Sequence, residues 1–349
     1  MNYKILPDSA GNTLVIRVRE QDYNFLKASF NYTNQYKAAI LLNATFRNVL
    51  GEGSRVLADL RLSENPAVKL HYSIHTPWKP NVGFSQKVAF NIFDAPMFDP
   101  EGNKITSFNY RHFLSETEFQ SVLSNPLLLG AGLSFNSQYL DANYHTYDSL
   151  NIRVTGWQAF GTIVYDNLDR SVFPHLGLRF QMRIEQHFSC RDNNPDISVA
   201  NKFWSGFFST DRYIAIYPKF SITGGLATGI NEGKNIHPMN FFYLGGENKY
   251  ETKFFAFPGI PFMSVSSSCF WSGKIGFQAE PWHEKFLFLN GGVVNTAHDL
   301  HNLITQFQIT YGIEAGAGIK TIIGPISLTF GSNTLTKSLV TNVSIGFVF

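Results

Sequence analysis

The chain has 349 residues, of which 15% are charged and 15% are aromatic, with 33 Phe and 28 Gly. A charged fraction well below the usual quarter or so, combined with this aromatic content, argues against a soluble helical protein. The formal net charge of +2, without any run of Lys and Arg, argues against a nucleic-acid-binding surface.

The first 21 residues read MNYKILPDSAGNTLVIRVREQ. They mix charged residues with a turn, whereas a secretory signal needs an uninterrupted apolar core. We therefore expect either that export information has been removed or that the chain is a fragment of a longer precursor.

From residue 22 onward the dominant hydrophobic period is two. An apolar set and a more polar set alternate in one early stretch, with Ile40, Leu42, Ala44 and Phe46 on one face and Leu41, Asn43 and Thr45 on the other. This alternation is typical of a sheet with one apolar face and one wet face.

Division of the chain at its Gly, Pro, Asn and Asp clusters predicts about 16 strands, an even number as in bacterial single-chain barrels. The predicted strands are 22–33, 36–48, 53–64, 67–76, 81–96, 104–123, 127–140, 150–165, 177–190, 201–216, 219–229, 269–281, 286–296, 305–317, 321–332 and 338–349. Most exceed the roughly 9–11 residues that a tilted membrane strand needs. The sequence therefore predicts an all-β fold, a closed antiparallel transmembrane β-barrel.

Two stretches compete with this prediction as helices. The charge-free run from Phe254 to Gly273 is long enough for a span but contains Pro258, Gly259 and Pro261, so we expect a long loop entering a strand. The segment SETEFQSVLSN has a capping-box pattern, yet its place in the alternation favours a strand.

The segment YDNLDRSVFPHLGLRF carries a resemblance to a known family. It is similar to the D-x-x-x-x-x-x-F-P-x-x-G turn of the BamA-type superfamily, also called bacterial surface antigens. The corresponding periplasmic turn residues here are Asp166, Asp169, Arg170, Phe173, Pro174 and Gly177. The family usually has Thr-Arg before the glycine, where this chain has His175 and Leu176.

The segment FYLGG and the long stretch after it resemble the part of the family's barrel that folds back into the lumen. The resemblance implies a long lumenal loop that contains Gly245 and Gly246. The family places an Arg-Gly-aromatic sequence at the tip of this loop. This chain has no arginine there, and its tip is Phe257, Pro258, Gly259 and Ile260.

Both termini also resemble the family. The opening ILPDSAGNTLVIRVRE is similar to the last hairpin of a periplasmic POTRA module, which divides the chain into a POTRA-like end at 1–21 and an outer-membrane barrel at 22–349. The final strand, with Phe347 and Phe349, is similar to the aromatic carboxyl-terminal signal by which such barrels are recognised for insertion.

The resemblance implies a bacterial outer-membrane barrel that anchors, inserts or translocates protein. It is most like the carboxyl-terminal barrel of Bacteroidetes patatin-like phospholipase proteins. The implied partners are outer-membrane lipids, the barrel assembly machinery and an amino-terminal patatin or POTRA domain of the same precursor. The sequence does not choose among the three roles, and it identifies neither a client nor an oligomeric state.

No enzymatic activity, cofactor or metal is predicted for the chain itself. A patatin-type lipase needs a G-x-S-x-G elbow, and this sequence has none. His298, Asp299 and His301 are interpreted as a solvated loop rather than as metal ligands. Glu280 and Glu314 are interpreted as charges that face a wet lumen rather than as an acid/base pair.

Three questions stay open at this point. A passive porin or transporter for small solutes shares the barrel pattern. A soluble secreted β-sandwich enzyme is an alternative from another class, although it leaves the terminal Phe unexplained. Whether Cys190 and Cys269 pair is also undecided, because the two cysteines lie far apart in the sequence.

Overall fold

A computed structural model describes the fold of most of the chain. The described residues are 2–8, 11–17, 24–76, 78, 81–99, 104–141, 151–193, 200–246, 253–336 and 339–347, with secondary structure alone before residue 24.

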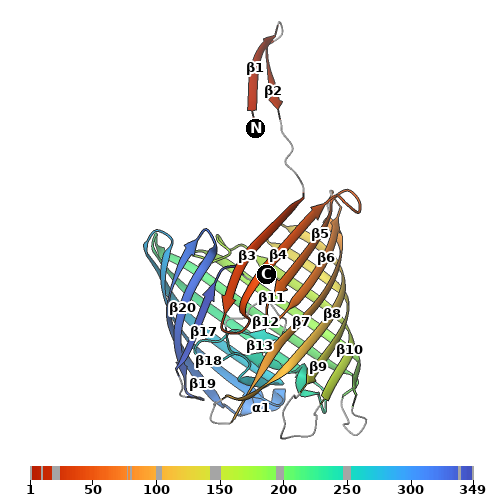
Figure 1. The fold of residues 1–349 in the computed structure, drawn as a ribbon, viewed down its shortest axis with the longest axis vertical. Helices are drawn as coiled ribbons and strands as arrows, with labels where there is room; N and C mark the ends of the chain where they lie inside the picture. Colours follow the sequence, from red (N-terminus) through yellow and green to blue (C-terminus); the bar gives the residue numbers. More distant parts are fainter. Residues whose placement is uncertain are drawn as a thin grey trace.

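Sixteen antiparallel strands form one closed barrel (Figure 1). The barrel strands are β3 (Phe25–Thr33), β4 (Lys37–Arg47), β5 (Ser54–Leu62), β6 (Ala67–His75), β7 (Asn81–Phe98), β8 (Lys104–Ser124), β9 (Leu127–Asp141), β10 (Asn151–Asp166), β11 (Gly177–Asp192), β12 (Phe203–Tyr217), β13 (Phe220–Glu232), β17 (Cys269–Trp282), β18 (Lys285–Ala297), β19 (Ile309–Thr321), β20 (Gly324–Asn333) and β21 (Val340–Ile345). Each pairs with the next along the chain, and β21 closes the ring against β3. The predicted barrel class and strand number are confirmed.

The exposed fractions of the side chains in β4 follow the predicted two-residue period. Ile40 and Phe46 are 53% and 42% exposed on the outside of the barrel, whereas Asn43 and Thr45 are 7% and 1% exposed. Apolar side chains of the same kind cover the outer face of other strands, including Leu226 and Ile313. Because lipid acyl chains solvate an apolar surface, the outer face is suited to contact with the membrane and the more polar inner face to contact with water.

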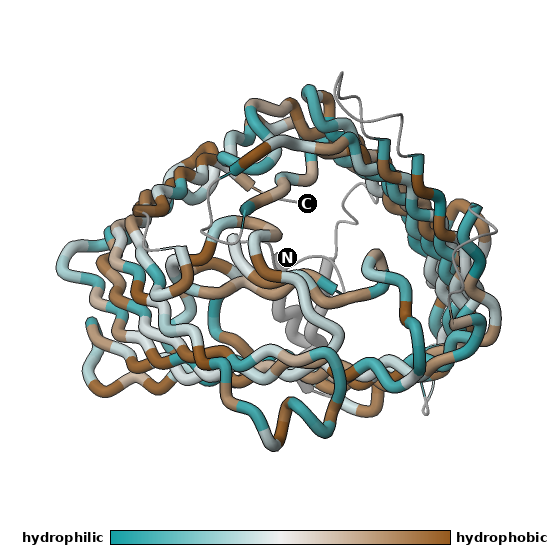
Figure 2. Tube along the Cα trace, turned by 90° about the horizontal axis from the view of Figure 1, so that it is seen from below, coloured by the Kyte–Doolittle hydropathy of each residue, from teal (hydrophilic) through white to brown (hydrophobic). Residues whose placement is uncertain are grey.

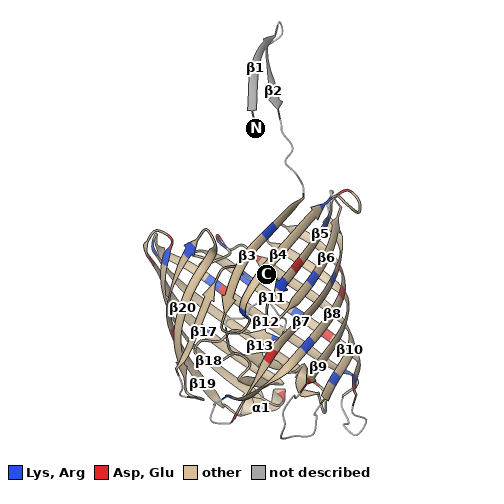
Figure 3. Ribbon diagram, viewed as in Figure 1, with Lys and Arg blue, Asp and Glu red and all other residues tan. Residues whose placement is uncertain are grey.

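Charged residues are scattered singly along the barrel strands rather than gathered in one band (Figure 3). The segment SETEFQSVLSN lies in β8, as the alternation predicted. None of the helices within the described ranges has both the length and the apolar character that a membrane span requires.

One short helix was not predicted. The helix α1 (Leu300–Thr305) precedes β19, so that strand begins at Ile309 rather than at residue 305. The Asp299 side chain caps α1 by accepting a hydrogen bond from Asn302 N at 2.7 Å. A six-residue helix is too short to show a 3.6-residue period, which is why the sequence did not reveal it.

The segment between β13 and β17 contacts the barrel from inside. It contains the 3₁₀ helix η1 (Pro238–Asn240) and a three-stranded sheet of β14 (Phe242–Leu244), β15 (Phe254–Phe255) and β16 (Val265–Ser267). In the view along the barrel axis, part of the chain crosses the interior of the ring (Figure 2). The apolar side chains of the β13–β17 segment pack against inward wall residues in two clusters, one around Phe93 and Phe254 and one around Phe242 and Phe270.

At the amino terminus, β1 (Asn2–Asp8) and β2 (Gly11–Arg17) form an antiparallel hairpin, which is a separate two-stranded sheet. The hairpin lies in the segment for which the sequence predicts the end of a POTRA-like module. The assignment to such a module stays a prediction.

Candidate functional site

The lumenal segment is fixed to the wall where it leaves β13. His237 Nδ1 accepts a hydrogen bond from Met239 N at 3.1 Å, so its Nε2 carries the proton and faces Asp192 Oδ2 at 3.1 Å. Burial lowers the pKa of His237, while Asp192 acts to raise it. Asn240 adds a second contact by donating to the free thiol of Cys190, Nδ2 to Sγ, at 3.4 Å.

The predicted glycine pair shapes the exit from β14. Gly245 and Gly246 have φ of +111° and +70°, which favours glycine at both positions. Their amides donate to Phe255 O and Ile260 O, each at 2.9 Å. The two residues therefore turn the chain while keeping it hydrogen-bonded to the strand and tip that follow.

The tip residues Phe257–Ile260 lie against a strip of glycines on the barrel wall. A Cβ on Gly331 of β20 would come within 2.6 Å of Gly259 Cα, and one on Gly312 of β19 would overlap Pro258 O. Asn333 Nδ2 donates to Gly259 O at 2.6 Å. The tip is thus held by close backbone approach and an amide hydrogen bond from Asn333, at the place where the resemblance implies an arginine.

A buried ionic network lies on the inner wall between β8 and β11. Arg183 Nη2 is 2.7 Å from Glu116 Oε2, and Arg183 Nε is 2.8 Å from Glu185 Oε1. Glu185 also accepts from His187 Nε2 at 3.2 Å. Two strands separate β8 from β11, so the alternation predicts that these side chains face inward but gives no sign that they meet.

The predicted periplasmic turn between β10 and β11 folds across one end of the barrel to β17 and β18. The Phe173 ring stacks on Phe286 of β18 at 4.5 Å, and Gln278 of β17 donates to Pro174 O at 3.0 Å. The φ of +49° at Phe173 is unusual for a residue with a side chain, which indicates that these contacts hold the backbone there.

The charged residues of this turn act on its own backbone and on β17. Asp169 Oδ1 accepts from the amides of His175 and Leu176, at 2.9 and 3.1 Å. Glu280 is 3.3 Å from Arg170 Nη1 and 3.0 Å from His175 Nε2. Hence His175, a departure from the family pattern, contacts Glu280 of β17, and this carboxylate binds the turn to that strand.

The remaining residues of the turn motif keep its two strands in place. Asp166 Oδ2 is 3.5 Å from Arg179 Nε across β10 and β11. Gly177 has φ +123°, and a Cβ there would be 2.6 Å from Asn167 O. In an antiparallel barrel, successive connections between strands lie at alternating ends. The β10–β11 turn and the β13–β17 segment therefore enter the lumen from opposite ends of the barrel.

The candidate chemical groups are not brought together. Asp299 is occupied as the cap of α1, and within the described ranges no three His, Cys, Asp or Glu side chains are placed to hold a metal ion. Glu314 accepts a hydrogen bond from Asn290 Nδ2 at 3.4 Å, while Glu280 binds the β10–β11 turn.

The seam between β21 and β3 is the shortest pairing in the ring. Among the described residues, only Ser344 with Thr33 and Ile345 with Tyr32 are in register, whereas β3 makes nine register pairs with β4 on its other side. Beyond Ile345, Gly346 turns with φ +86°, and Phe347 O accepts from the Asn31 side chain at 2.9 Å. Phe347 is exposed, and Phe349 lies outside the described residues.

Comparison with known proteins agrees with this architecture. BamA from Haemophilus ducreyi lacking POTRA domains 1–3 superposes with a TM-score of 0.71 at 10% identity, over 99% of this chain and 74% of that one. CdiB from Escherichia coli gives 0.59 at 12% identity over 99% and 67%, and CdiB from Acinetobacter baumannii gives 0.57 at 13% over 99% and 64%. Identities this low establish a shared fold.

No curated protein matches the sequence. The family model described as the OMP85 superfamily matches residues 12–349, which is nearly the whole chain. Together with the sixteen-stranded barrel, this match shows that the chain belongs to the OMP85 superfamily.

Proposed function

We propose that this barrel is a protein assembly or translocation unit of the bacterial outer membrane, and that it forms the carboxyl-terminal part of a patatin-like phospholipase fusion. The superfamily and the apolar outer face support the location. The seam between β21 and β3 is the single observation that carries the role.

Within the described part of the chain, one edge of β3 has no strand partner over most of its length. Among the described residues, register pairs with β21 end at Tyr32, so residues 25–31 pair with β4 alone. Backbone groups left unpaired in hydrocarbon cost several kcal/mol each. An extended segment of a client protein would satisfy them by adding a strand at this edge.

The link to a patatin-like precursor rests on the sequence resemblance. The hairpin β1–β2 directly precedes the barrel, as the end of a POTRA-like module would. In this proposal any phospholipase site lies in a domain upstream of Met1, and the partners are outer-membrane lipids and the barrel assembly machinery. The coding sequence upstream of Met1 tests this part, because it must contain a G-x-S-x-G elbow.

A passive pore is the competing function. It needs an open lumen, but the β10–β11 turn and the β13–β17 segment enter this lumen from opposite ends. We therefore expect low conductance in planar bilayers, and a large steady conductance of the wild-type barrel would favour the pore.

A disulfide across the seam tests the assembly role. The change is Thr33→Cys with Ser344→Cys, two small residues in register, placed in the full-length precursor. We expect the oxidised form to lose most client insertion or translocation, because β3 and β21 can no longer separate. Activity is measured as the yield of client protein in the outer-membrane fraction, before and after reduction.

The matched control keeps the cysteine at 344 and moves its partner. Ser327→Cys with Ser344→Cys joins β21 to β20, which pair over six residues, and leaves the seam free. Full activity of the oxidised control with loss in the seam variant supports the proposal. Equal activity of both oxidised forms contradicts a role for the seam. The barrel would then serve only to anchor an attached domain in the membrane.

A further inference from the structure

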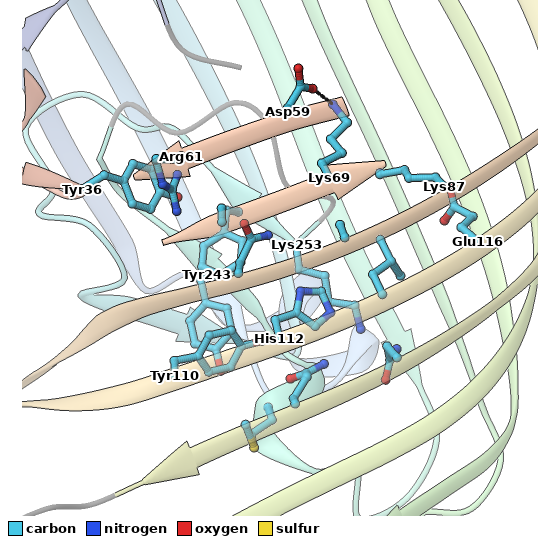
Figure 4. A pocket seen from close by; sticks show the side chains of 18 of the residues that line it. Tyr36, Asp59, Arg61, Lys69, Lys87, Tyr110, His112, Glu116, Tyr243 and Lys253 are labelled. Atoms are coloured by element: carbon cyan, nitrogen blue, oxygen red, sulfur yellow. Dashed lines mark ion pairs between the residues drawn. The ribbon is translucent and has the colours of Figure 1, made fainter. Parts of the chain in front are cut away.

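A cavity of about 210 Å³ lies in the lumen between the β13–β17 segment and the inner faces of β3 to β11. We call it the chamber. A water molecule needs about 10–15 Å³ on the same measure, so the chamber has room for roughly 15 waters or one small solute. Tyr110 and Tyr243 line it, and Lys253 reaches into it from the loop (Figure 4).

Basic side chains outnumber acidic ones in the chamber lining. The five cationic residues are Arg61, Lys69, Lys87, Arg183 and Lys253. The three anionic residues are Asp59, Glu116 and Glu185. The lining therefore has an excess of positive charge, and charges inside a protein are screened less than charges in bulk water.

The wall itself already binds the three carboxylates. Glu116 and Glu185 both pair with Arg183, at 2.7 and 2.8 Å. Asp59 accepts from Asn43 Nδ2 at 2.5 Å and is 3.7 Å from Lys69. The ion pairs of these carboxylates are therefore with wall residues, and Glu185 acts on the Lys253 ammonium only through space.

Lys253 is the one of these five cations that comes from the β13–β17 segment rather than from a barrel strand. Its Nζ donates to Asn240 O at 3.0 Å, and among the described residues no carboxylate oxygen lies within 4.0 Å of it. Lys253 and Lys87 both act electrostatically on His112 of β8. Burial lowers the pKa of Lys253, a cost that a bound anion would offset.

We propose that the chamber is a binding site for a small oxyanion, a solute that carries a carboxylate or a phosphate group. Lys253 and His112 hold the anionic group by hydrogen bonds, and Lys87 adds attraction from the neighbouring strand β7. The rings of Tyr110 and Tyr243 pack against the rest of the solute. This site is independent of the seam and adds a ligand-binding property to the proposed assembly role.

Calorimetric titration of the folded barrel in detergent tests the site, with inorganic phosphate, citrate and uncharged glucose as probes. We expect both anions to bind and glucose not to bind, and binding to weaken as NaCl is raised. The stronger of the two anions identifies phosphate or carboxylate as the preferred group. Lys253→Gln is expected to weaken anion binding at least tenfold.

Lys274→Gln is the matched control, because Lys274 lines a different lumenal cavity and pairs with Asp211 at 2.6 Å. It removes the same charge from the lumen and should leave anion binding unchanged. His112→Gln is a second test in case Lys253→Gln does not fold, and it should also weaken binding. Absence of anion binding by the wild type, or equal weakening in Lys253→Gln and Lys274→Gln, overturns the proposal.

Discussion

Replacement of Gly312 by Val is expected to displace the loop tip Phe257–Ile260 from the barrel wall. The new Cβ would overlap Pro258 O and come within 2.8 Å of Phe257 Cε1, and a backbone oxygen cannot move aside without the tip. Overpacking of this kind costs about 1–3 kcal/mol. The displaced tip should also raise conductance, because it lies in the lumen.

Gly224→Val is the matched control, since a Cβ at this β13 position meets nothing within 4 Å. Thermal unfolding and planar-bilayer conductance measure both effects. We expect a lower melting temperature and a higher conductance for Gly312→Val and little change for Gly224→Val. Identical behaviour of the two variants would show that the glycine strip does not hold the tip.

Leu226→Arg should block assembly of the barrel in a membrane. The Leu226 side chain is 61% exposed on the outer face of β13, and an arginine facing lipid costs about 2–4 kcal/mol near the bilayer midplane. Folded and unfolded barrel differ in gel mobility without heating, which gives the folded fraction in lipid vesicles.

Thr223→Arg is the control on the same strand. Thr223 has the parity of Ser221 and Asn231, which are 2% and 3% exposed, so its side chain faces the wet interior. We expect it to assemble close to the wild-type level. Equal folded fractions for Leu226→Arg and Thr223→Arg would mean that the outer face is not in contact with lipid.

The barrel strands were predictable because side-chain alternation and strand-breaking residues act locally. Ile40, Asn43 and Thr45 alternate between lipid and lumen as their polarity requires, and the predicted ends of β4 are within one residue of those observed. The Pro-Gly-Ile-Pro sequence likewise ruled out a spanning helix at 254–273 from local geometry alone.

The contacts inside the lumen were not predictable in the same way. Arg183 and Glu116 are 67 positions apart, and nothing in either neighbourhood shows that curvature of the barrel brings them together. The same holds for His175 and Glu280, or for Gly259 and Asn333. Wall glycines such as Gly312 appeared as ordinary strand residues, because a close approach by another segment leaves no local pattern.

The alternating outer and inner faces are tested most directly by a spin-label scan across residues 39–47 in lipid vesicles. Single cysteines are placed in a Cys190→Ser, Cys269→Ser background, because both native thiols are free. We predict that oxygen accessibility peaks at Ile40, Leu42, Ala44 and Phe46, while a water-soluble nickel complex reaches the intervening positions better. A folded protein that dissolves without detergent, with the apolar set shielded from oxygen, would contradict the assignment of this face to lipid.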